Sequence, residues 1–394
     1  MLLNPSGIVA VSLAHCLGVG VPLLWDALIE HRSGLRPNDL EWCNLNCWIG
    51  RYPDLERAIP PTRLEKYDCR NHRLAWSALQ DPLLQASLET EYTKHGTHRV
   101  ALVMGTSTAG MQSIETAYKT RLTTGLWPAS FSFGDVHNVE GLCQFVRDAI
   151  GLKGPSIGIT SACTSSTKVF LIAQKWLTTG VADAVLVGGA DSLCLSTLHG
   201  FNSLQLLSDK ACRPFDQCRN GISIGEAAGF ALLTREDSNV MFLGGGESSD
   251  AYHITTPDPE GSGAIQAISQ ALRVTGLAAK DIDYINAHGT ATQFNDRAEA
   301  KALRQIFGEE DTPISSTKGT TGHTLGAAGI TEAVITIEAL SRQTLPPMTQ
   351  LTQADSDIAL NLVTKAAHAR IRHAMTNNFG FGGTNCSLIF GQGI

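Results

Sequence analysis

The chain carries little charge, and its charge is biased toward acidic side chains. Only 17% of the 394 residues are charged, and 30 Lys and Arg stand against 37 Asp and Glu, which gives a formal net charge of −7. The sequence also has no basic tail. This composition argues against nucleic-acid binding, which requires a concentration of positive charge.

Paired cysteines are also missing. The ten cysteines are scattered, and no two have the spacing C-x-x-C; Cys43 with Cys47 and Cys212 with Cys218 have no histidines at zinc-ligand spacing. The sequence therefore predicts no metal site. Scattered cysteines in a chain of this length indicate a reducing cytoplasm.

No hydrophobic run is long enough to cross a membrane, which takes about 20 apolar residues. Residues 1–25 contain no charged side chain, but Asn4, Pro5 and Ser6 interrupt them and no basic segment precedes them. We therefore expect neither a signal peptide nor a membrane span. Residues 7–14 are better explained as a buried strand, followed by a helix around 23–30. No strand is followed by G-x-G-x-x-G, so dinucleotide binding is not indicated.

The residues that are abundant indicate a densely packed α/β protein. Hydrophobic residues make up 43% of the chain, and there are 38 glycines. Short apolar runs that end in small residues alternate with helical patterns, at 100–104, 157–159, 184–187 and 284–285. This rhythm predicts mostly parallel sheet covered by helices. The length predicts at least two subdomains.

A weak internal repeat suggests two similar halves. Pro155-Ser156-Ile157 leads through Cys163 into a helical pattern, and Pro313-Ile314-Ser315 leads through His323 into another. Each unit reads as a strand, a polar turn and a helix rich in small residues. The predicted division lies near residue 240, giving halves at 1–240 and 241–394.

Cys163 has the most informative position in the chain. It lies between the strand-like run 155–160 and a helical pattern from Thr167, in which apolar residues recur at i, i+3, i+4, i+7 and i+8. Free N–H groups at a helix N-terminus favour a thiolate, and the thiolate is the nucleophilic form. The local pattern alone fits one buried structural cysteine among ten equally well.

Three later segments carry further candidate chemistry. His288 follows a predicted strand, Lys318 and His323 share a glycine-rich turn, and residues 377–385 form a glycine-rich loop with Phe379 and Phe381. A lone histidine is more often structural than catalytic, so no single segment decides the function.

Together these segments resemble the elongating-type β-ketoacyl-ACP synthases of the thiolase-like superfamily. The resemblance rests on six motifs in that family's order and spacing: SACTSS around Cys163, RPFDQCRNGISIGEAAG at 213–229, SSDAYHITTPDPEG at 248–261, HGTATQFND at 288–296, STKGTTGHTLGAAG at 316–329 and NNFGFGGTN at 377–385. It implies an α/β five-layer αβαβα fold built from two duplicated halves, with a homologous dimer as the minimal unit.

The resemblance also implies roles for individual residues. Cys163 would accept the acyl group, and His288 and His323 would donate hydrogen bonds to the malonyl thioester oxygen. Lys318 and Glu332 would support this site. Thr290 and Thr292 would hold the pantetheine arm. The backbone N–H groups of Cys163 and Phe381 would form an oxyanion hole, and the loop from Phe379 to Phe381 would gate the acyl tunnel.

The implied reaction is a decarboxylative Claisen condensation, which extends an acyl chain by two carbons and needs no metal or redox cofactor. Neighbouring families fit less well. Thiolases carry a second catalytic cysteine, whereas Cys386 is expected in the core; priming synthases have asparagine where His323 stands. Chain-length factors, the inactive partners of polyketide ketosynthases, lack the nucleophile. A serine hydrolase would need G-x-S-x-G, which residues 105–109 do not provide.

Departures from the family pattern raise the question of pathway. Ala291, Asn220 and Ala227 replace commoner residues, and Thr108 stands in a turn that lines the acyl pocket in the family. Thr108 suggests a specialised system, such as polyketide or aryl polyene biosynthesis; ordinary drift explains it equally well. Such a system would pair this chain with a chain-length factor that lacks the cysteine, so both homodimer and heterodimer remain open.

The acyl carrier protein of this family is acidic, so we expect a basic patch to bind it. The candidates are Arg63, Lys66, Arg70, Lys119 and Arg121. An alternative for any one of them is a salt bridge on the surface of a helix.

Overall fold

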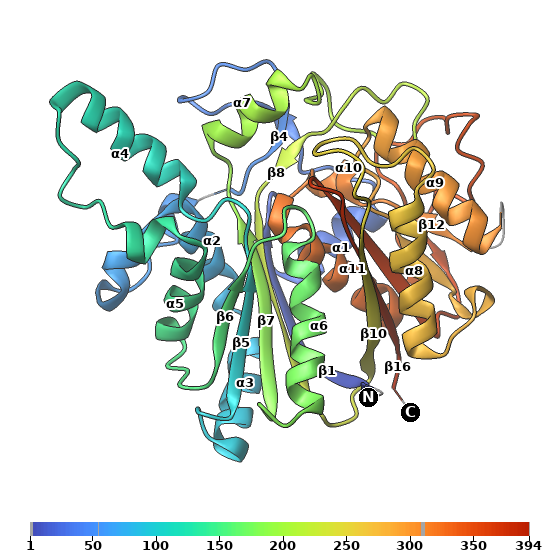
Figure 1. Cartoon of the computed structure of the whole chain (residues 1–394), viewed down its shortest axis with the longest axis horizontal. Coiled ribbons are helices and arrows are strands. Elements are labelled where there is room, and N and C mark those ends of the chain that lie inside the picture. The colour runs from blue at the N-terminus through green and yellow to red at the C-terminus, as the bar shows by residue number, and fades with distance from the viewer. Residues whose placement is uncertain (1–2, 54, 309–311, 394) are drawn as a thin grey trace.

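One mixed sheet runs through the whole molecule (Figure 1). In the computed structural model, which describes residues 3–53, 55–308 and 312–393, eleven strands join in the order β12-β11-β15-β16-β10-β1-β9-β7-β5-β6, with β2 paired to β1. Within this sheet, as far as the structure describes it, the two halves join where Ser6 and Gly7 of β1 pair with Phe242 and Met241 of β10.

The two halves repeat the same strand arrangement. The first half contains β1 (Ser6–His15), β5 (Val100–Gly105), β6 (Ser156–Ile159), β7 (Ala184–Asp191) and β9 (Ala227–Thr234). The second half contains β10 (Val240–Ser249), β11 (Tyr284–Asn286), β12 (Ile314–Ser315), β15 (His373–Gly380) and β16 (Thr384–Gln392). Numbered by chain order within its half, each sheet reads 3-2-4-5-1. In each half, the first two pairs of neighbouring strands in that order are parallel, and the last two pairs are antiparallel. The predicted duplication is confirmed.

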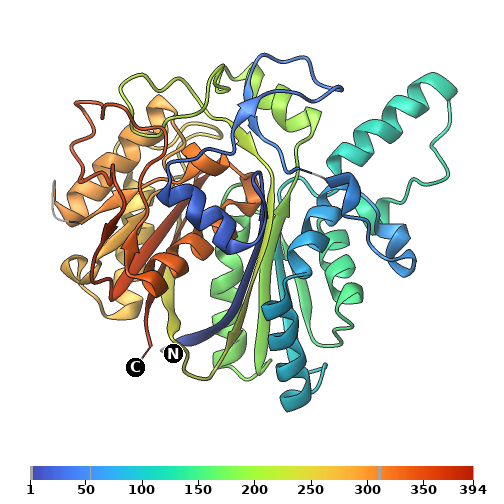
Figure 2. The same cartoon turned by 180° about the vertical axis from the view of Figure 1, so that it is seen from behind.

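Helices complete five layers. α6 (Ser165–Thr178) and α11 (Ala328–Arg342) pack against each other between the two halves of the sheet. α2 (Arg70–Leu79), α3 (Pro82–His95) and α5 (Val139–Ala149) cover the outer face of the first half, and α8 (Ser262–Thr275) and α9 (Gln293–Phe307) cover the second (Figure 2). This arrangement confirms the predicted αβαβα fold.

The remaining elements are shorter or lie at the ends of the sheets. The helices are α1 (Val21–Ile29), α4 (Met111–Thr124), α7 (Leu195–Ser203) and α10 (Lys318–Thr321), with the short helical segments η1 (Leu55–Arg57), η2 (Thr62–Tyr67), η3 (Phe133–His137), η4 (Ala279–Asp281) and η5 (Leu325–Ala327). The short strands are β2 (Gly18–Val19), β3 (Arg36–Pro37), β4 (Trp48–Gly50), β8 (Ile224–Gly225), β13 (Thr344–Leu345) and β14 (Ala367–His368). Within the described part of the chain, no helix is both long and apolar enough to cross a bilayer.

Small residues let the two central helices approach closely. A Cβ atom added at Gly329 of α11 would lie 2.3 Å from the backbone nitrogen of Thr167 in α6. A Cβ at Gly105, at the end of β5, would lie 2.6 Å from the backbone of Ser165. The small-residue pattern after His323 therefore reflects backbone contact across the middle layer.

We expect Gly329→Ala to lower the free energy of unfolding by about 1–3 kcal/mol, because the added methyl group overpacks a contact with backbone atoms that cannot rotate away. Chemical denaturation measures the change. Gly200→Ala in α7 is the matched control, since a Cβ there meets nothing within 4 Å. Equal stability of the two variants would contradict the prediction.

Candidate active site

Cys163 lies in the sharp turn between β6 and α6, with its side chain buried. Ala162 before it adopts a left-handed backbone with φ of 47°, which few non-glycine residues do. The Ser165 hydroxyl fixes the turn, because it accepts a hydrogen bond from the Ser161 N–H at 2.9 Å and donates one to the Ala162 carbonyl at 2.6 Å. The turn thus holds the thiol just before the first residue of α6.

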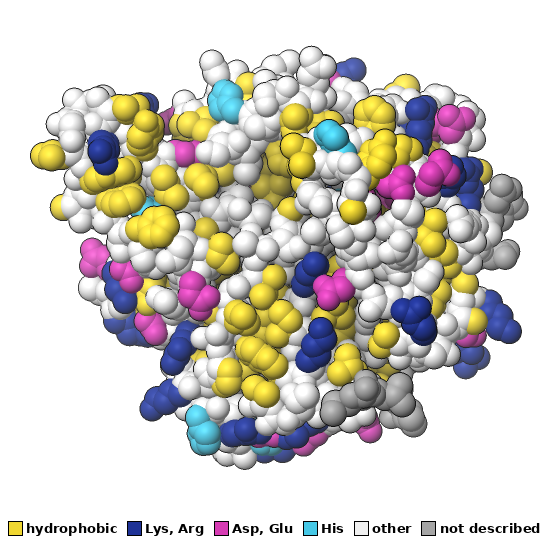
Figure 3. Space-filling model, viewed as in Figure 1, with side chains coloured by type: hydrophobic (Ala, Val, Ile, Leu, Met, Phe, Trp, Pro, Cys, Tyr) yellow, Lys and Arg dark blue, Asp and Glu magenta, His cyan; other side chains and the backbone are white. Residues whose placement is uncertain are grey.

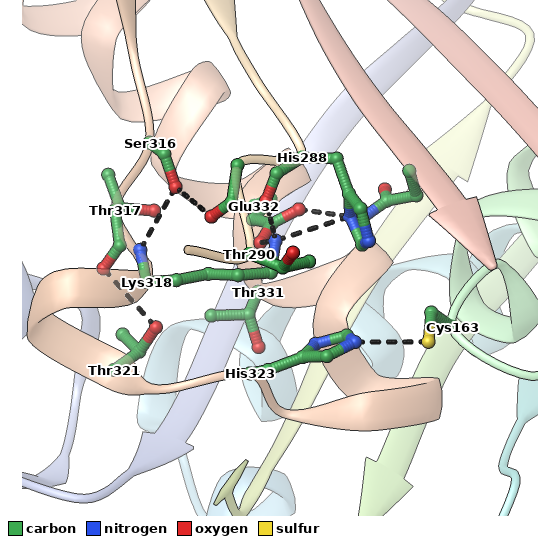
Figure 4. Close-up of polar contacts among 12 residues, drawn as sticks. Cys163, His288, Thr290, Ser316, Thr317, Lys318, Thr321, His323, Thr331 and Glu332 are labelled. Atoms are coloured by element: carbon green, nitrogen blue, oxygen red, sulfur yellow. Dashed lines mark hydrogen bonds and ion pairs between the residues drawn. The ribbon is translucent and has the colours of Figure 1, made fainter. Parts of the chain in front are cut away.

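His323 is the direct partner of this thiol. Its Nε2 lies 3.0 Å from the Cys163 Sγ, although the two residues are 160 positions apart (Figure 4). The backbone of His323 is tied to the other half of the molecule, since its N–H donates to the Ser223 carbonyl at 2.8 Å and its carbonyl accepts from the Gly225 N–H at 2.9 Å. The two turns that the sequence repeat singled out therefore meet face to face.

Both members of this pair rest in their neutral forms. Burial raises the pKa of Cys163 to about 11, and the Phe381 N–H and the Lys318 ammonium offset only part of that effect. Burial, followed by the Lys318 charge, holds the pKa of His323 well below its usual value. Burial therefore opposes the thiolate form that the position before α6 was expected to favour. The imidazole is placed to accept the thiol proton.

His288 faces His323 from the end of β11. The two ring centroids are 5.3 Å apart at an interplanar angle of 86°. The Glu299 carboxylate accepts hydrogen bonds from the N–H groups of His288 and Gly289, both at 2.7 Å, and so fixes this loop. Glu299, which the sequence analysis did not single out, thus holds the backbone that carries His288.

Lys318 determines which nitrogen of His288 carries the proton. Its Nζ lies 3.3 Å from the His288 Nδ1 and donates to the His288 carbonyl at 2.5 Å. An ammonium has only donors, so Nδ1 must accept and Nε2 must bear the hydrogen. Burial and the Lys318 charge also hold the pKa of His288 well below its usual value. His288 is therefore a neutral imidazole with one N–H to donate.

A second network fixes Lys318; the sequence had pointed to its member Glu332 but not to Asn378 or Thr167. Lys318 forms a buried ion pair with Glu332 of α11, whose other oxygen accepts from the Asn378 amide at 2.6 Å. The Asn378 carbonyl oxygen in turn accepts from the Thr167 hydroxyl of α6 at 2.8 Å. This chain of contacts connects the helix that follows Cys163 to the residues around His288.

We expect Asn378→Leu to lower the condensation rate by about tenfold. The variant removes a donor to a buried carboxylate, and a hydrogen bond to a charged group contributes about 1.5–3 kcal/mol. Steady-state turnover measures the loss, and thermal unfolding checks that the protein remains folded. Wild-type turnover in a folded variant would show that Asn378 has no part in holding Lys318.

The glycine-rich loop closes the site from the other side. The Phe379 ring packs against His288 at a centroid distance of 5.9 Å, and the Phe381 ring packs against Phe201 at 5.2 Å. The Phe381 N–H points at the Cys163 thiol. A Cβ added at Gly380 would lie 3.2 Å from the Cys163 nitrogen, so a side chain there would crowd that N–H.

A cavity reaches Cys163, His288 and His323 from the surface, and Thr290 and Thr292 line it. Their contact with a pantetheine arm stays a prediction. The two threonine hydroxyls lie 3.0 Å apart. Among the described residues, no group of three or more His, Cys, Asp or Glu could hold a metal ion.

The structure does not place Thr108 in this cavity. Its hydroxyl donates to Asp191 at 2.8 Å, and the same carboxylate accepts from the Gly326 N–H at 2.6 Å. Asp191 is fully buried. Through Asp191, Thr108 therefore helps to join the 106–108 turn to the η5 turn before α11. Its contact with substrate stays a prediction.

The five basic residues predicted to bind a carrier protein do not line the cavity. Arg70 is wrong as a surface contact, because it forms a buried ion pair with Glu226 and its side chain is only 10% exposed. Arg63 donates to the carbonyls of Asp148 and Ala149, and Lys66 pairs with Asp135. Lys119 and Arg121 lie on α4, where Arg121 stacks over Trp127.

Comparison with known proteins identifies the family. Residues 5–239 match the model of the beta-ketoacyl synthase N-terminal domain, and residues 241–352 match that of the C-terminal domain. The chain belongs to the β-ketoacyl synthase family. It is a condensing acyltransferase.

Curated relatives cover nearly the whole chain. The 3-oxoacyl-[acyl-carrier-protein] synthase 2 of Vibrio cholerae is 32% identical, over 95% of this chain and 95% of its own. Nodulation protein E of Rhizobium meliloti is 34% identical, over 95% and 96%.

Solved structures share the fold of this β-ketoacyl synthase. A chain of the complex between the ketosynthase ApeO and its chain length factor ApeC from Xenorhabdus doucetiae superposes with a TM-score of 0.90 at 36% identity, covering 99% of this chain and 98% of that one. A chain of the ishigamide ketosynthase/chain length factor superposes with a TM-score of 0.88 at 26% identity, covering 99% of each.

Proposed function

We propose that this β-ketoacyl synthase condenses an acyl group held on Cys163 with a malonyl group delivered by an acyl carrier protein. The observation that carries the proposal is the neutral pair of Cys163 and His323 at 3.0 Å, facing a second neutral imidazole whose Nδ1 is held by Lys318. Curated relatives named as acyl-carrier-protein synthases support the choice of carrier.

In the first half-reaction the acyl group moves to Cys163. His323 Nε2 accepts the thiol proton as the sulfur attacks the thioester carbonyl, and the carrier thiolate leaves with that proton. The N–H groups of Cys163 and Phe381 stabilise the oxyanion of the tetrahedral intermediate. The fixed turn at Ala162 and the Phe381 N–H beside the thiol support these roles.

In the second half-reaction malonyl-carrier loses carbon dioxide. The bond to the carboxylate breaks, and its electron pair becomes an enolate with charge on the thioester oxygen. His288 donates its Nε2–H to that oxygen, and His323 donates too when its Nε2 bears the proton. The enolate carbon then attacks the acyl carbonyl, the Cys163 thiolate leaves, and it takes up one proton from solvent. The product is a β-ketoacyl thioester two carbons longer, and this route uses no cofactor.

We also propose that the enzyme is the ketosynthase subunit of a type II polyketide or aryl polyene system, acting with a homologous chain-length factor. The arm formed by α4 and the segment after it extends away from the sheets (Figure 1). It exposes several large apolar side chains: Tyr118 at 53%, Leu122 at 69%, Leu126 at 73% and Phe133 at 63%. Soluble monomers rarely leave such a patch uncovered, and a homologous chain is the occupant we propose. The similarity to ketosynthases solved with chain length factors favours this over a homodimeric fatty-acid synthase.

Intact-mass spectrometry tests the chemistry. Wild type and Cys163→Ala are each incubated with a panel of acyl-carrier proteins; an adduct on wild type alone is expected, and its absence from the folded wild-type complex would refute the assignment of Cys163. Adducts limited to saturated medium and long chains would reject the polyketide or polyene pathway.

Light scattering of the chain alone and after co-expression with a homologue that lacks the cysteine tests the partner. A stable heterodimer is expected. A fully active homodimer that does not bind the homologue would favour the fatty-acid alternative.

A further inference from the structure

Asp191, the last residue of β7, is a buried carboxylate that takes no part in the two half-reactions. Figure 3 shows acidic side chains at the surface, several of them beside Lys or Arg. Asp191 is fully buried instead, and every hydrogen bond that the described residues donate to it comes from a hydroxyl or a backbone N–H group. Burying a carboxylate costs much free energy unless such donors replace its water. Asp191 therefore requires a fixed set of donors around it.

These donors come from two segments that are far apart in the chain. In the turn after β5, the Thr106 hydroxyl donates to Asp191 at 2.6 Å, and the N–H groups of Ser107 and Thr108 donate at 2.9 Å. The hydroxyls of Ser107 and Thr108 donate as well. In η5, the Gly326 N–H donates at 2.6 Å. The carboxylate thus joins the turn after β5 to η5.

The turn that holds these donors lies between the two catalytic turns. On one side, a Cβ added at Gly105 would lie 2.6 Å from the backbone in the first turn of α6, which begins two residues after Cys163. On the other side, a Cβ added at Gly326, three residues after His323, would lie 2.7 Å from the Ser107 nitrogen. Backbone meets backbone on both faces. The turn therefore acts as a spacer that sets how far apart the segments carrying the thiol and the imidazole lie.

We infer that Asp191 is a positioning residue for acylation: it holds this spacer in place and so keeps His323 within reach of the Cys163 thiol. The inference rests on the proposed function and adds a residue to it. Proton transfer from the thiol to the imidazole requires a separation of about 2.6–3.2 Å, and the observed distance is 3.0 Å. The hydrogen bonds of Asp191 go to the spacer and to η5, so it acts through the backbone.

The test replaces Asp191 with asparagine, which keeps the shape but turns one accepting oxygen into an NH₂ donor that faces other donors. Asp216→Asn is the matched control. Asp216 is also fully buried and accepts hydrogen bonds from three backbone N–H groups and one hydroxyl, but it does not line the cavity. Acylation of Cys163 by an acyl-carrier protein is followed by rapid quench and intact mass between pH 7 and 9, and thermal unfolding checks the fold of each variant.

Wild type and Asp216→Asn should acylate at a rate that does not change with pH in this range. Burial raises the pKa of Cys163 to about 11 and holds that of His323 well below its usual value, so the pair stays neutral and the imidazole takes the proton. Asp191→Asn should acylate about a hundredfold more slowly at pH 7, the usual effect of losing a general base. Its rate should rise about tenfold per pH unit, because the thiol must then lose its proton to solvent.

A second background tests whether Asp191 acts through His323. Asp191→Asn/His323→Ala should acylate as fast as His323→Ala alone, because the partner that Asp191 positions is already missing. A further fall in the double variant would overturn the inference. So would a pH-independent rate in a slow but folded Asp191→Asn, or an equal loss in Asp216→Asn.

Ser107→Ala provides the test if Asp191→Asn does not fold. It removes one hydroxyl donor to the carboxylate and should slow acylation at pH 7 about tenfold. Acylation at the wild-type rate in Ser107→Ala would then overturn the inference. Failure of wild type to form any acyl adduct would refute the proposed function itself, so the two failures are distinguishable.

Discussion

Replacing His288 with alanine is expected to separate the two half-reactions. Decarboxylation of malonyl-carrier should fall by about 10²–10³, the usual effect of removing one donor to a developing oxyanion. Acylation of Cys163 should stay close to the wild-type rate, because the thiol is paired with His323 and not with His288. Intact mass follows the acyl adduct, and formation of acetyl-carrier follows decarboxylation.

Two further variants make this result interpretable. His323→Ala should impair both half-reactions, because it removes the proton acceptor of the thiol. His288→Gln retains an N–H donor and more of the bulk that packs against Phe379, so it should recover part of the decarboxylation lost in His288→Ala. If acylation fell in His288→Ala as far as decarboxylation, the separate roles assigned to the two histidines would be wrong.

Replacing Gly380 with alanine is expected to slow acylation of Cys163 by about 10²–10³, which is the loss seen when an oxyanion donor is removed. The new Cβ would lie 3.2 Å from the Cys163 nitrogen and 2.9 Å from the Thr384 hydroxyl. It would stand where the thioester oxygen must approach the Cys163 N–H. A rapid-quench series analysed by intact mass measures the rate.

The contact of the new Cβ with the Thr384 hydroxyl provides the control. Gly380→Ala/Thr384→Ala removes the clash with the Thr384 hydroxyl but keeps the Cβ beside the Cys163 nitrogen, so acylation should remain slow. Thr384→Ala alone should acylate at nearly the wild-type rate. Recovery of fast acylation in the double variant would show that strain at Thr384, and not the blocked N–H, caused the defect.

The basic patch shows where residue type misleads. Arg70 was predicted to face a carrier protein together with Arg63 and Lys66, which are near it in the chain, yet Glu226 binds it in a buried ion pair. The two residues are 156 positions apart. The sequence shows only which charged residues are neighbours in the chain. Whether a given side chain is buried depends on which helices and strands pack against it.

Local sequence did determine the parts that depend on local geometry. The apolar runs at 100–104 and 184–187 lie in β5 and β7, and the helical spacing after Cys163 lies in α6. The six motifs also identified the family, because they contain the reactive side chains in the order that is typical of it. These features follow from backbone geometry and short-range patterning, which neighbouring residues set.

Only the tertiary structure decided how these pieces act on one another. Folding brings Cys163 and His323 together although they are 160 positions apart in the sequence. It likewise joins Asn378 to Thr167, 211 positions away, and to Glu332, 46 positions away. Burial of Cys163 in the folded molecule also raises its pKa, an effect that only partly yields to the Phe381 N–H and Lys318 and that the local sequence could not show. Contact and desolvation are properties of the packed molecule, so the sequence alone supplied the reactive groups while the fold set their partners and charges.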